Sequence, residues 1–292
     1  NLIKAMSLGS LIQMFEQAPI NNFADGAAEF SDRATVLANC ISLLEEARDM
    51  MSSSPVSDEF KSTVLWPEMN LQKTVNAFLS RYYLLAGNYT ESITAANAVL
   101  NDSDATNSMW VYDANNQNPI WNRTVNSADL NPQTNFGLLG AYVPEAGDGR
   151  VNFYLGDDAG FANGDAGGQA LSEMLGFFGT NTASIPIYLK GEMLLNKAEA
   201  FARQSQLSDA VIQLNLVRQK NDDPLSVNAN LPAWTGNETS QADILEEIYK
   251  NRCIELFLTG MRFEDSKRFH PNFVVPTAAN TTNERNRNYY PY

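Results

Sequence analysis

Apolar residues recur at helical spacing in the first part of the chain. From Leu2 to Phe15, Leu, Ile and Met side chains cover most of a helical surface, which predicts a largely buried helix that stops before Pro19. A second helix is expected to begin near Ser31, whose hydroxyl can cap a helix N-terminus, and to run toward Met51. The Ser-Ser-Ser-Pro run that follows predicts its end.

Residues 70–100 have the pattern of a helical hairpin. Two helical stretches meet at Gly87, which is expected to adopt the left-handed conformation that ends many helices. Small residues at Ala95, Ala96 and Ala98 allow the second helix to approach the first closely. This arrangement is typical of a tetratricopeptide-type unit.

A similar unit recurs over residues 187–220, with a turn at 205–208 and a small residue, Ala210, where such repeats need one. The two units are far apart in the sequence and share no clean consensus. A generic scaffold of helical hairpins therefore remains an alternative to a true repeat.

Long irregular segments separate these helices. Residues 101–185 are rich in Asn, Asp, Gly and aromatic residues, and a loop of this length inside a compact domain is usually functional. Residues 241–258 predict a mostly buried helix closed by Thr259 and Gly260, followed by extended coil. The predicted fold class is mainly α, with tetratricopeptide-like helical hairpins and long irregular loop insertions. The expected divisions of this single domain over 1–292 are helical repeats at about 1–101 and 186–221, a ligand-loop insertion at about 101–185, and a closing helix and tail at about 241–292.

Charge and residue counts narrow the range of functions. The chain has 20 Lys and Arg against 34 Asp and Glu, a formal charge of -14, which would repel a phosphate backbone. Nucleic acid is therefore not expected as a partner. The sequence contains no run of about 20 apolar residues, which a membrane-spanning helix would need. Cys40 and Cys253 match no metal-ligand spacing, and they are either free buried thiols or one long-range disulfide.

The sequence offers little for catalysis or metal binding. His270 is the single histidine and is followed by Pro271 in an irregular tail, so a two-histidine metal site cannot be assembled and a histidine-based triad is not expected. The Gly-rich stretch 156–168 lacks the Gly-Lys-Ser/Thr ending of a phosphate loop and the spacing of an EF-hand. Its Asp and Asn residues could offer oxygens to calcium, but a solvated acidic loop is favoured. We expect no catalytic residue, no metal and no cofactor.

Three segments together resemble the SusD-like (RagB/SusD) family. These are the tyrosine-rich hairpin at 70–100, the stretch 188–200 together with 215–218, and the stretch 251–268. The last is the most specific, because it is similar to the family's ordered pattern of an Arg, a Glu-Leu, a Gly-x-Arg and an Asp-x-Lys-Arg. The motif residues are Arg252, Glu255, Gly260, Arg262, Asp265, Lys267 and Arg268.

The closing motif has a structural interpretation. Arg252 and Glu255 stand three residues apart on one helix, and Arg262 and Asp265 repeat that spacing after Gly260. We therefore expect charged pairs that tie the last helix to its neighbours rather than a catalytic group.

The resemblance implies a non-catalytic, cell-surface protein that binds oligosaccharide or polysaccharide and delivers it to a SusC-like TonB-dependent transporter. It also implies an outward-facing protein in the outer membrane of a bacterium of the Bacteroidetes kind. Its membrane association would depend on an N-terminal lipid anchor that this chain lacks, together with the family's first segment.

Sugar binding suits the loop composition, because aromatic rings pack on the apolar faces of pyranose rings while polar side chains bond the hydroxyls. For each aromatic residue, core packing remains an equal alternative. The candidate glycan-binding residues are Trp110, Tyr112, Trp121, Tyr142 and Trp234. Two rival functions stay open, a helical-repeat adaptor for proteins and, less favoured, a glycoside-processing enzyme.

Overall fold

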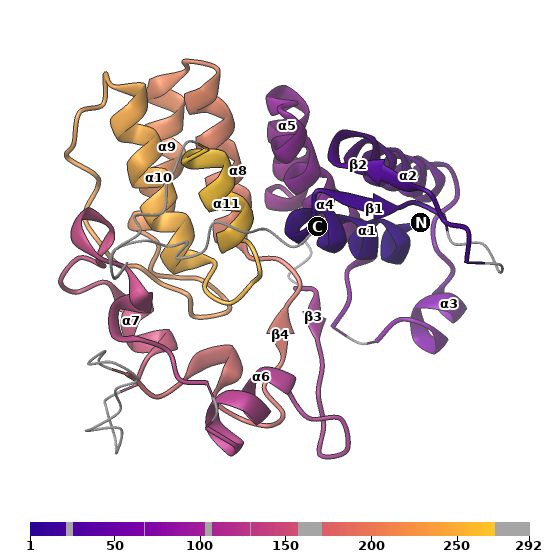
Figure 1. Cartoon of the computed structure of the whole chain (residues 1–292), viewed down its shortest axis with the longest axis horizontal. Coiled ribbons are helices and arrows are strands. Elements are labelled where there is room, and N and C mark those ends of the chain that lie inside the picture. Colours follow the sequence, from indigo (N-terminus) through magenta and orange to yellow (C-terminus); the bar gives the residue numbers. More distant parts are fainter. Residues whose placement is uncertain (22–25, 67, 103–106, 129, 157–170, 272–292) are drawn as a thin grey trace.

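The structure is a computed structural model, and it describes residues 1–21, 26–66, 68–102, 107–128, 130–156 and 171–271. It is mainly helical (Figure 1), as the sequence predicts. The helices are α1 (Leu2–Met14), α2 (Arg33–Ser53), α3 (Asp58–Thr63), α4 (Leu71–Ala86), α5 (Tyr89–Leu100), α6 (Pro119–Trp121), α7 (Gly149–Tyr154), α8 (Lys190–Arg203), α9 (Leu207–Arg218), α10 (Gln241–Glu255) and α11 (Arg262–Phe269). Two short antiparallel ribbons join β1 (Gln17–Pro19) to β2 (Phe30–Asp32) and β3 (Met109–Trp110) to β4 (Ile185–Pro186).

The first helix ends before Pro19, as expected, but the cap of α2 differs from the prediction. The Asp32 carboxylate, not the Ser31 hydroxyl, caps α2 by accepting the backbone N–H of Thr35 at 2.8 Å. Ser31 instead lies in β2, where it pairs with Ala18 of β1. Ser31, which the sequence predicts as the helix cap, is therefore part of the β1–β2 ribbon.

Both predicted hairpins are present. Gly87, with φ 80°, ends α4 in the left-handed region. Ala95 and Ala96 are buried as expected, whereas Ala98 is exposed. A serine also contributes to the close approach, since the Ser92 hydroxyl donates to the Ser80 carbonyl at 2.8 Å across α4 and α5.

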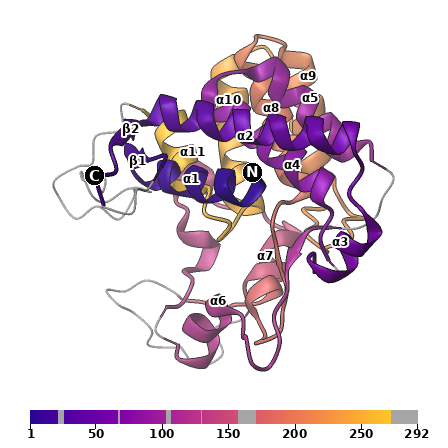
Figure 2. The same ribbon diagram turned by 90° about the vertical axis from the view of Figure 1, so that its right-hand side faces the viewer.

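The two helical hairpins pack side by side, together with α1, α2, α10 and α11, and we call this set of helices the frame. In the second hairpin, Ala198 of α8 and Ala210 of α9 are fully buried where the two helices meet. Helix α5 of the first hairpin packs against α8 of the second, and α10 packs against α8 and α9. Figure 2 shows these helices gathered on one side of the molecule, with α6 and α7 on the other.

Four helices were missing from the sequence-based prediction. Helix α3 lies between two predicted helices, α6 and α7 lie in the insertion expected to be irregular, and α11 lies in a region expected to be coil. Helix α10 ends at Glu255, and the turn that follows uses Leu258 and Gly260 in the left-handed region, with φ 57° and 85°. The inward face of α11 is polar, because Glu264, Asp265 and Ser266 are buried. Because its buried residues are polar, the sequence of α11 lacks the apolar stripe by which a buried helix is predicted.

The insertion between residues 101 and 185 leaves and rejoins the frame through the β3–β4 ribbon (Figure 1). Beyond this neck Phe136, Tyr154 and Phe177 pack near one another, in an apolar core that also includes Tyr249 and Ile254 of α10. Phe257, just after α10, joins this core and anchors the insertion to the frame. Within the residues that the structure describes, none of the helices combines the length and apolarity needed to cross a bilayer.

Candidate ligand-binding site

Three of the aromatic residues singled out from sequence lie in the insertion. Trp110 lies in β3 with 37% of its surface exposed. Trp121 ends α6 and is half-buried, as is Tyr112, whose pKa is raised by burial. Each of the three is therefore at least partly accessible to solvent.

Tyr142 and Trp234 contact the frame. The Tyr142 hydroxyl donates to the carboxylate of Glu246 on α10 at 2.6 Å, and its ring packs edge-on against Tyr249 with centroids 5.5 Å apart. Trp234 packs against the apolar core between α8, α9 and α10. These contacts give both residues an anchoring position on the frame.

Trp110 is paired with a residue that sequence reasoning missed. Its ring stacks on Trp66 with centroids 5.2 Å apart and an interplanar angle of 27°. The Trp66 indole N–H donates to the carbonyl oxygen of Met109, which fixes this ring to the neck of the insertion. Trp66 lies between α3 and α4, outside the aromatic-rich insertion, so the composition of its own neighbourhood gave no signal.

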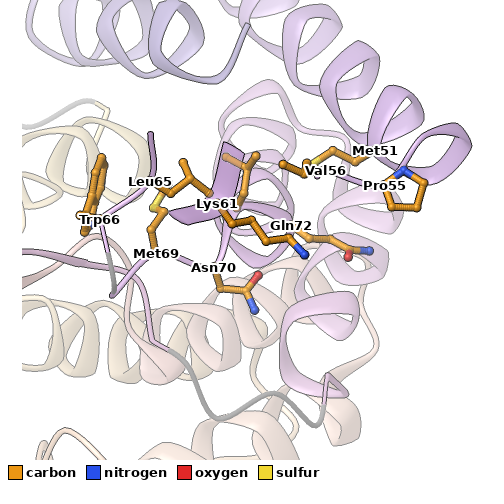
Figure 3. A pocket seen from close by; sticks show the side chains of 10 residues that line it. Met51, Pro55, Val56, Lys61, Leu65, Trp66, Met69, Asn70 and Gln72 are labelled. Atoms are coloured by element: carbon orange, nitrogen blue, oxygen red, sulfur yellow. The ribbon is translucent and has the colours of Figure 1, made fainter. Parts of the chain in front are cut away.

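Trp66 also lines a cavity of about 520 Å³, which we call the tryptophan pocket (Figure 3). Figure 3 shows Trp66 at one end of the pocket and Met51 and Pro55 at the other. The pocket is enclosed by the end of α2, by α3 and by the first turn of α4. Its lining residues are Met51, Pro55, Val56, Lys61, Leu65, Trp66, Met69, Asn70, Leu71 and Gln72.

The lining of the pocket is mainly apolar. Seven of the ten lining residues are apolar, and the three polar ones are Lys61, Asn70 and Gln72. Among the residues described, Lys61 is the one charged side chain in this lining. An apolar wall with a few polar groups is typical of a small-molecule site.

A second hollow, the apolar groove, adjoins the tryptophan pocket. It has a volume of about 630 Å³ and shares Met51, Leu65, Trp66, Met69 and Leu71 with the pocket. On its far side it is bounded by the start of α1, by α2 and by α3. The two hollows therefore lie on either side of one shared wall.

Residues of the closing motif make ion pairs between helices, and the partners differ from those expected. Arg252 donates to Asp265 of α11 and to Asn196 of α8, at 2.9 Å each, rather than pairing with Glu255. Glu255 instead accepts bonds from Lys220, after α9, and from Arg150 of α7. Arg252 and Glu255 therefore pair with different elements rather than with each other, and these pairs tie α10 to its neighbours.

Glu199 of α8 is the carboxylate on which several guanidinium groups converge. Burial by itself would raise the pKa of Glu199, but Arg268, Arg252 and Arg203 outweigh burial and lower it to about 2. Arg268 approaches at 2.7 Å and Arg203 at 2.8 Å. This carboxylate therefore stays ionised and joins α8 to α11.

The two cysteines are free and buried, so the thiol alternative holds over the disulfide. Burial raises the pKa of Cys40 to about 11 and of Cys253 to about 12. The possible calcium loop falls mainly on residues 157–170, which lie outside the described residues. In the remainder, no group of three His, Cys, Asp or Glu side chains is placed to hold a metal ion.

The fold and the pocket define a helical-hairpin binding scaffold with a looped insertion. Residues 178–292 match the model of the SusD family, and this confirms the resemblance seen in the sequence. No curated protein sequence matches the chain.

Several solved structures with this fold come from Bacteroides species. A SusD superfamily protein from Bacteroides vulgatus is 17% identical, with a TM-score of 0.60 over 92% of this chain and 65% of that one. A SusD-like carbohydrate binding protein from the same species is 18% identical, with a TM-score of 0.65 over 90% and 60%. Surface glycan-binding protein A from Bacteroides uniformis is 15% identical, with a TM-score of 0.55 over 91% and 65%. The chain thus spans about 60–65% of the length of these structures.

Proposed function

We propose that this protein binds carbohydrate without chemically altering it, and that the Trp66–Trp110 stack and the tryptophan pocket are the contact site. The observation that carries the proposal is the stack itself, which presents Trp110 to solvent and places Trp66 in the wall of a cavity of about 520 Å³. The names of similarly folded proteins, a carbohydrate binding protein and a surface glycan-binding protein, support the ligand class.

Carbohydrate suits this site for physical reasons. The C–H face of a pyranose is apolar and packs on an aromatic ring, while its hydroxyls need hydrogen-bonding partners at the edges. Trp66 and Met69 supply apolar surface, and the exposed amide of Gln72 supplies both a donor and an acceptor. Because Trp66 is fixed by its indole hydrogen bond, little conformational entropy is lost when a ring packs on it.

The experiment compares the two stacked tryptophans with a third tryptophan outside the pocket. A glycan array would first identify a ligand, and calorimetry would then measure its affinity for Trp66→Ala, Trp110→Ala and Trp121→Ala. Loss of stacking at the pocket should weaken binding by about tenfold. Trp121→Ala, a half-buried tryptophan outside the pocket lining, is the matched control.

If affinity falls for Trp121→Ala and not for the other two, the site lies elsewhere on the insertion, as the sequence-based candidates allow. If no glycan binds the wild-type protein, the carbohydrate function itself fails. Release of reducing ends from a polysaccharide would contradict the non-catalytic part of the proposal.

We further propose the partner and location that the resemblance implies: delivery of the glycan to a SusC-like TonB-dependent transporter, by a protein lipid-anchored on the outer face of the outer membrane. A surface for a protein partner is available on α9, where Ile212 and Leu216 lie one turn apart with 55% and 50% of their surfaces exposed. Co-purification of the full-length protein with a transporter encoded beside it would test this step.

The same exposed residues favour one alternative, a helical-repeat adaptor that binds only protein. Ile212→Ser with Leu216→Ser should abolish a protein complex in either case. An adaptor would show no response of tryptophan fluorescence to any glycan, whereas the proposed function requires one.

A further inference from the structure

We propose that the tryptophan pocket selects an acidic saccharide, whose carboxylate pairs with the ammonium group of Lys61. This inference rests on the proposed carbohydrate function and adds the chemical class of the ligand. It is carried by the combination of one aromatic wall and one cationic side chain in the same cavity.

The charge of the lining is the first reason. Among the described residues that line the pocket, Lys61 is the only charged side chain, and the others are apolar or neutral amides. The chain as a whole carries a formal charge of -14. The one charge in this pocket is thus opposite in sign to the net charge of the protein, and it offers an anion a local attraction beside the aromatic wall.

The position of Lys61 is the second reason. In Figure 3 its side chain runs across the pocket away from Trp66, and its ammonium end lies in view between Asn70 and Gln72. A sugar ring packed on Trp66 would direct a carboxylate toward this polar end. Apolar neighbours such as Met69 offer no competing acceptor at this end of the pocket, and the exposed ammonium group stays accessible to a ligand carboxylate.

The existing partner of Lys61 does not prevent this role. Lys61 contacts Asp58 at 3.2 Å, one turn earlier on α3, but the two side chains are 56% and 100% exposed. An exposed pair of this kind contributes little to stability, so exchange of Asp58 for a ligand carboxylate costs little. Asp58 does not line the pocket, and the first turn of α4, which does, has no acidic residue.

The test uses one saccharide in charged and neutral forms. Oligogalacturonides four to six units long would be compared with the same oligomers after methyl esterification, which removes the charge and keeps the ring shape. Affinity would be measured by calorimetry and by tryptophan fluorescence for the wild-type protein, Lys61→Met and Lys190→Met. Lys190 is an exposed lysine at the start of α8 and controls for the change in net charge.

The acidic oligomer should bind the wild-type protein at least tenfold more tightly than the ester, and added salt should reduce this preference. Lys61→Met should remove the preference, and Lys190→Met should retain it. Asp58→Asn, which removes the competing carboxylate, should strengthen binding of the acidic form slightly.

Three results would overturn the inference. Equal affinity for the oligogalacturonide and its methyl ester, or a preference that is retained in Lys61→Met, would show that the pocket does not select its ligand by charge. Binding of a neutral glycan at Trp66, with neither oligogalacturonide bound, would have the same meaning and leave the carbohydrate function intact. Failure of every saccharide to bind would overturn the carbohydrate function as well.

Discussion

Charged residues serve opposite purposes in the frame and in the tryptophan pocket. In the frame, Arg81 of α4 and Glu192 of α8 are buried and joined by two bonds, of 2.7 and 2.8 Å. In the pocket, Lys61 is exposed and its one close pair is weak. A buried charge must keep its partner at all times, whereas an exposed one can exchange its partner for a ligand. The comparison separates residues that hold the protein together from residues that are available to bind.

The largest expected effect comes from breaking the Arg81–Glu192 pair. Glu192→Ala leaves the Arg81 guanidinium buried without its carboxylate, which should reduce the free energy of unfolding by about 3–5 kcal/mol. Asp58→Ala, which breaks the exposed pair with Lys61, should reduce it by less than about 1 kcal/mol. Urea denaturation measures both.

Replacing both partners, as Arg81→Met with Glu192→Leu, should recover most of the loss, because no unpaired charge then remains. If Glu192→Ala reduced the free energy of unfolding as little as Asp58→Ala does, the contrast between buried pairs in the frame and the exposed pair at the pocket would be wrong.

Acid should destabilise the frame through Glu199. Its pKa is about 2 in the folded protein, below the ordinary value of 4.5, so the stabilisation is complete above pH 5 and is lost as the pH falls toward 2. The shift corresponds to about 3 kcal/mol. Unfolding free energy measured from pH 6 to pH 2 should fall less steeply for Glu199→Gln than for the wild-type protein. Identical slopes would contradict this assignment.

Crowding at Gly191 should have a smaller effect. This helical glycine of α8 lies against the Glu255 side chain, and an added methyl group would overlap its carboxylate. Alanine is otherwise the better helix former, so a loss of about 1–3 kcal/mol for Gly191→Ala would report the displacement of Glu255 from Lys220 and Arg150. A gain in thermal stability would show that Glu255 can move without loss.

The smallest expected signal is the labelling of the thiols. Cys40 and Cys253 are buried, and burial raises their pKa values to about 11 and 12, so little thiolate forms at pH 8. A thiol reagent should modify neither cysteine in the native protein and both in urea. Rapid labelling of the native protein would show that the frame opens locally.

Much of the frame could be predicted from sequence because its signals are local. Three such signals are the apolar spacing of α1, the left-handed Gly87 and the small Ala210. Each can be recognised from residues that are close in the sequence. Helix α11 could not be predicted in the same way. Its buried face is made of Glu264 and Asp265, which are stable there only because arginines from distant segments reach them.

The candidate site shows the same division. Trp110 was found from sequence because it lies in the aromatic-rich insertion, but its stacking partner Trp66 lies 44 positions earlier (110 − 66). Nothing in the spacing of these two residues predicts the contact. Tyr142 and Trp234 belong to the same compositional class, yet they pack against the frame.

The sequence by itself determined the helical class, the two hairpins and the family resemblance. The tertiary structure alone decided which charges are paired, which tryptophans meet and where a cavity forms. The physical reason is range: periodicity and capping depend on neighbours along the chain, whereas Arg81 and Glu192 meet across 111 residues. Only folding brings such groups within bonding distance.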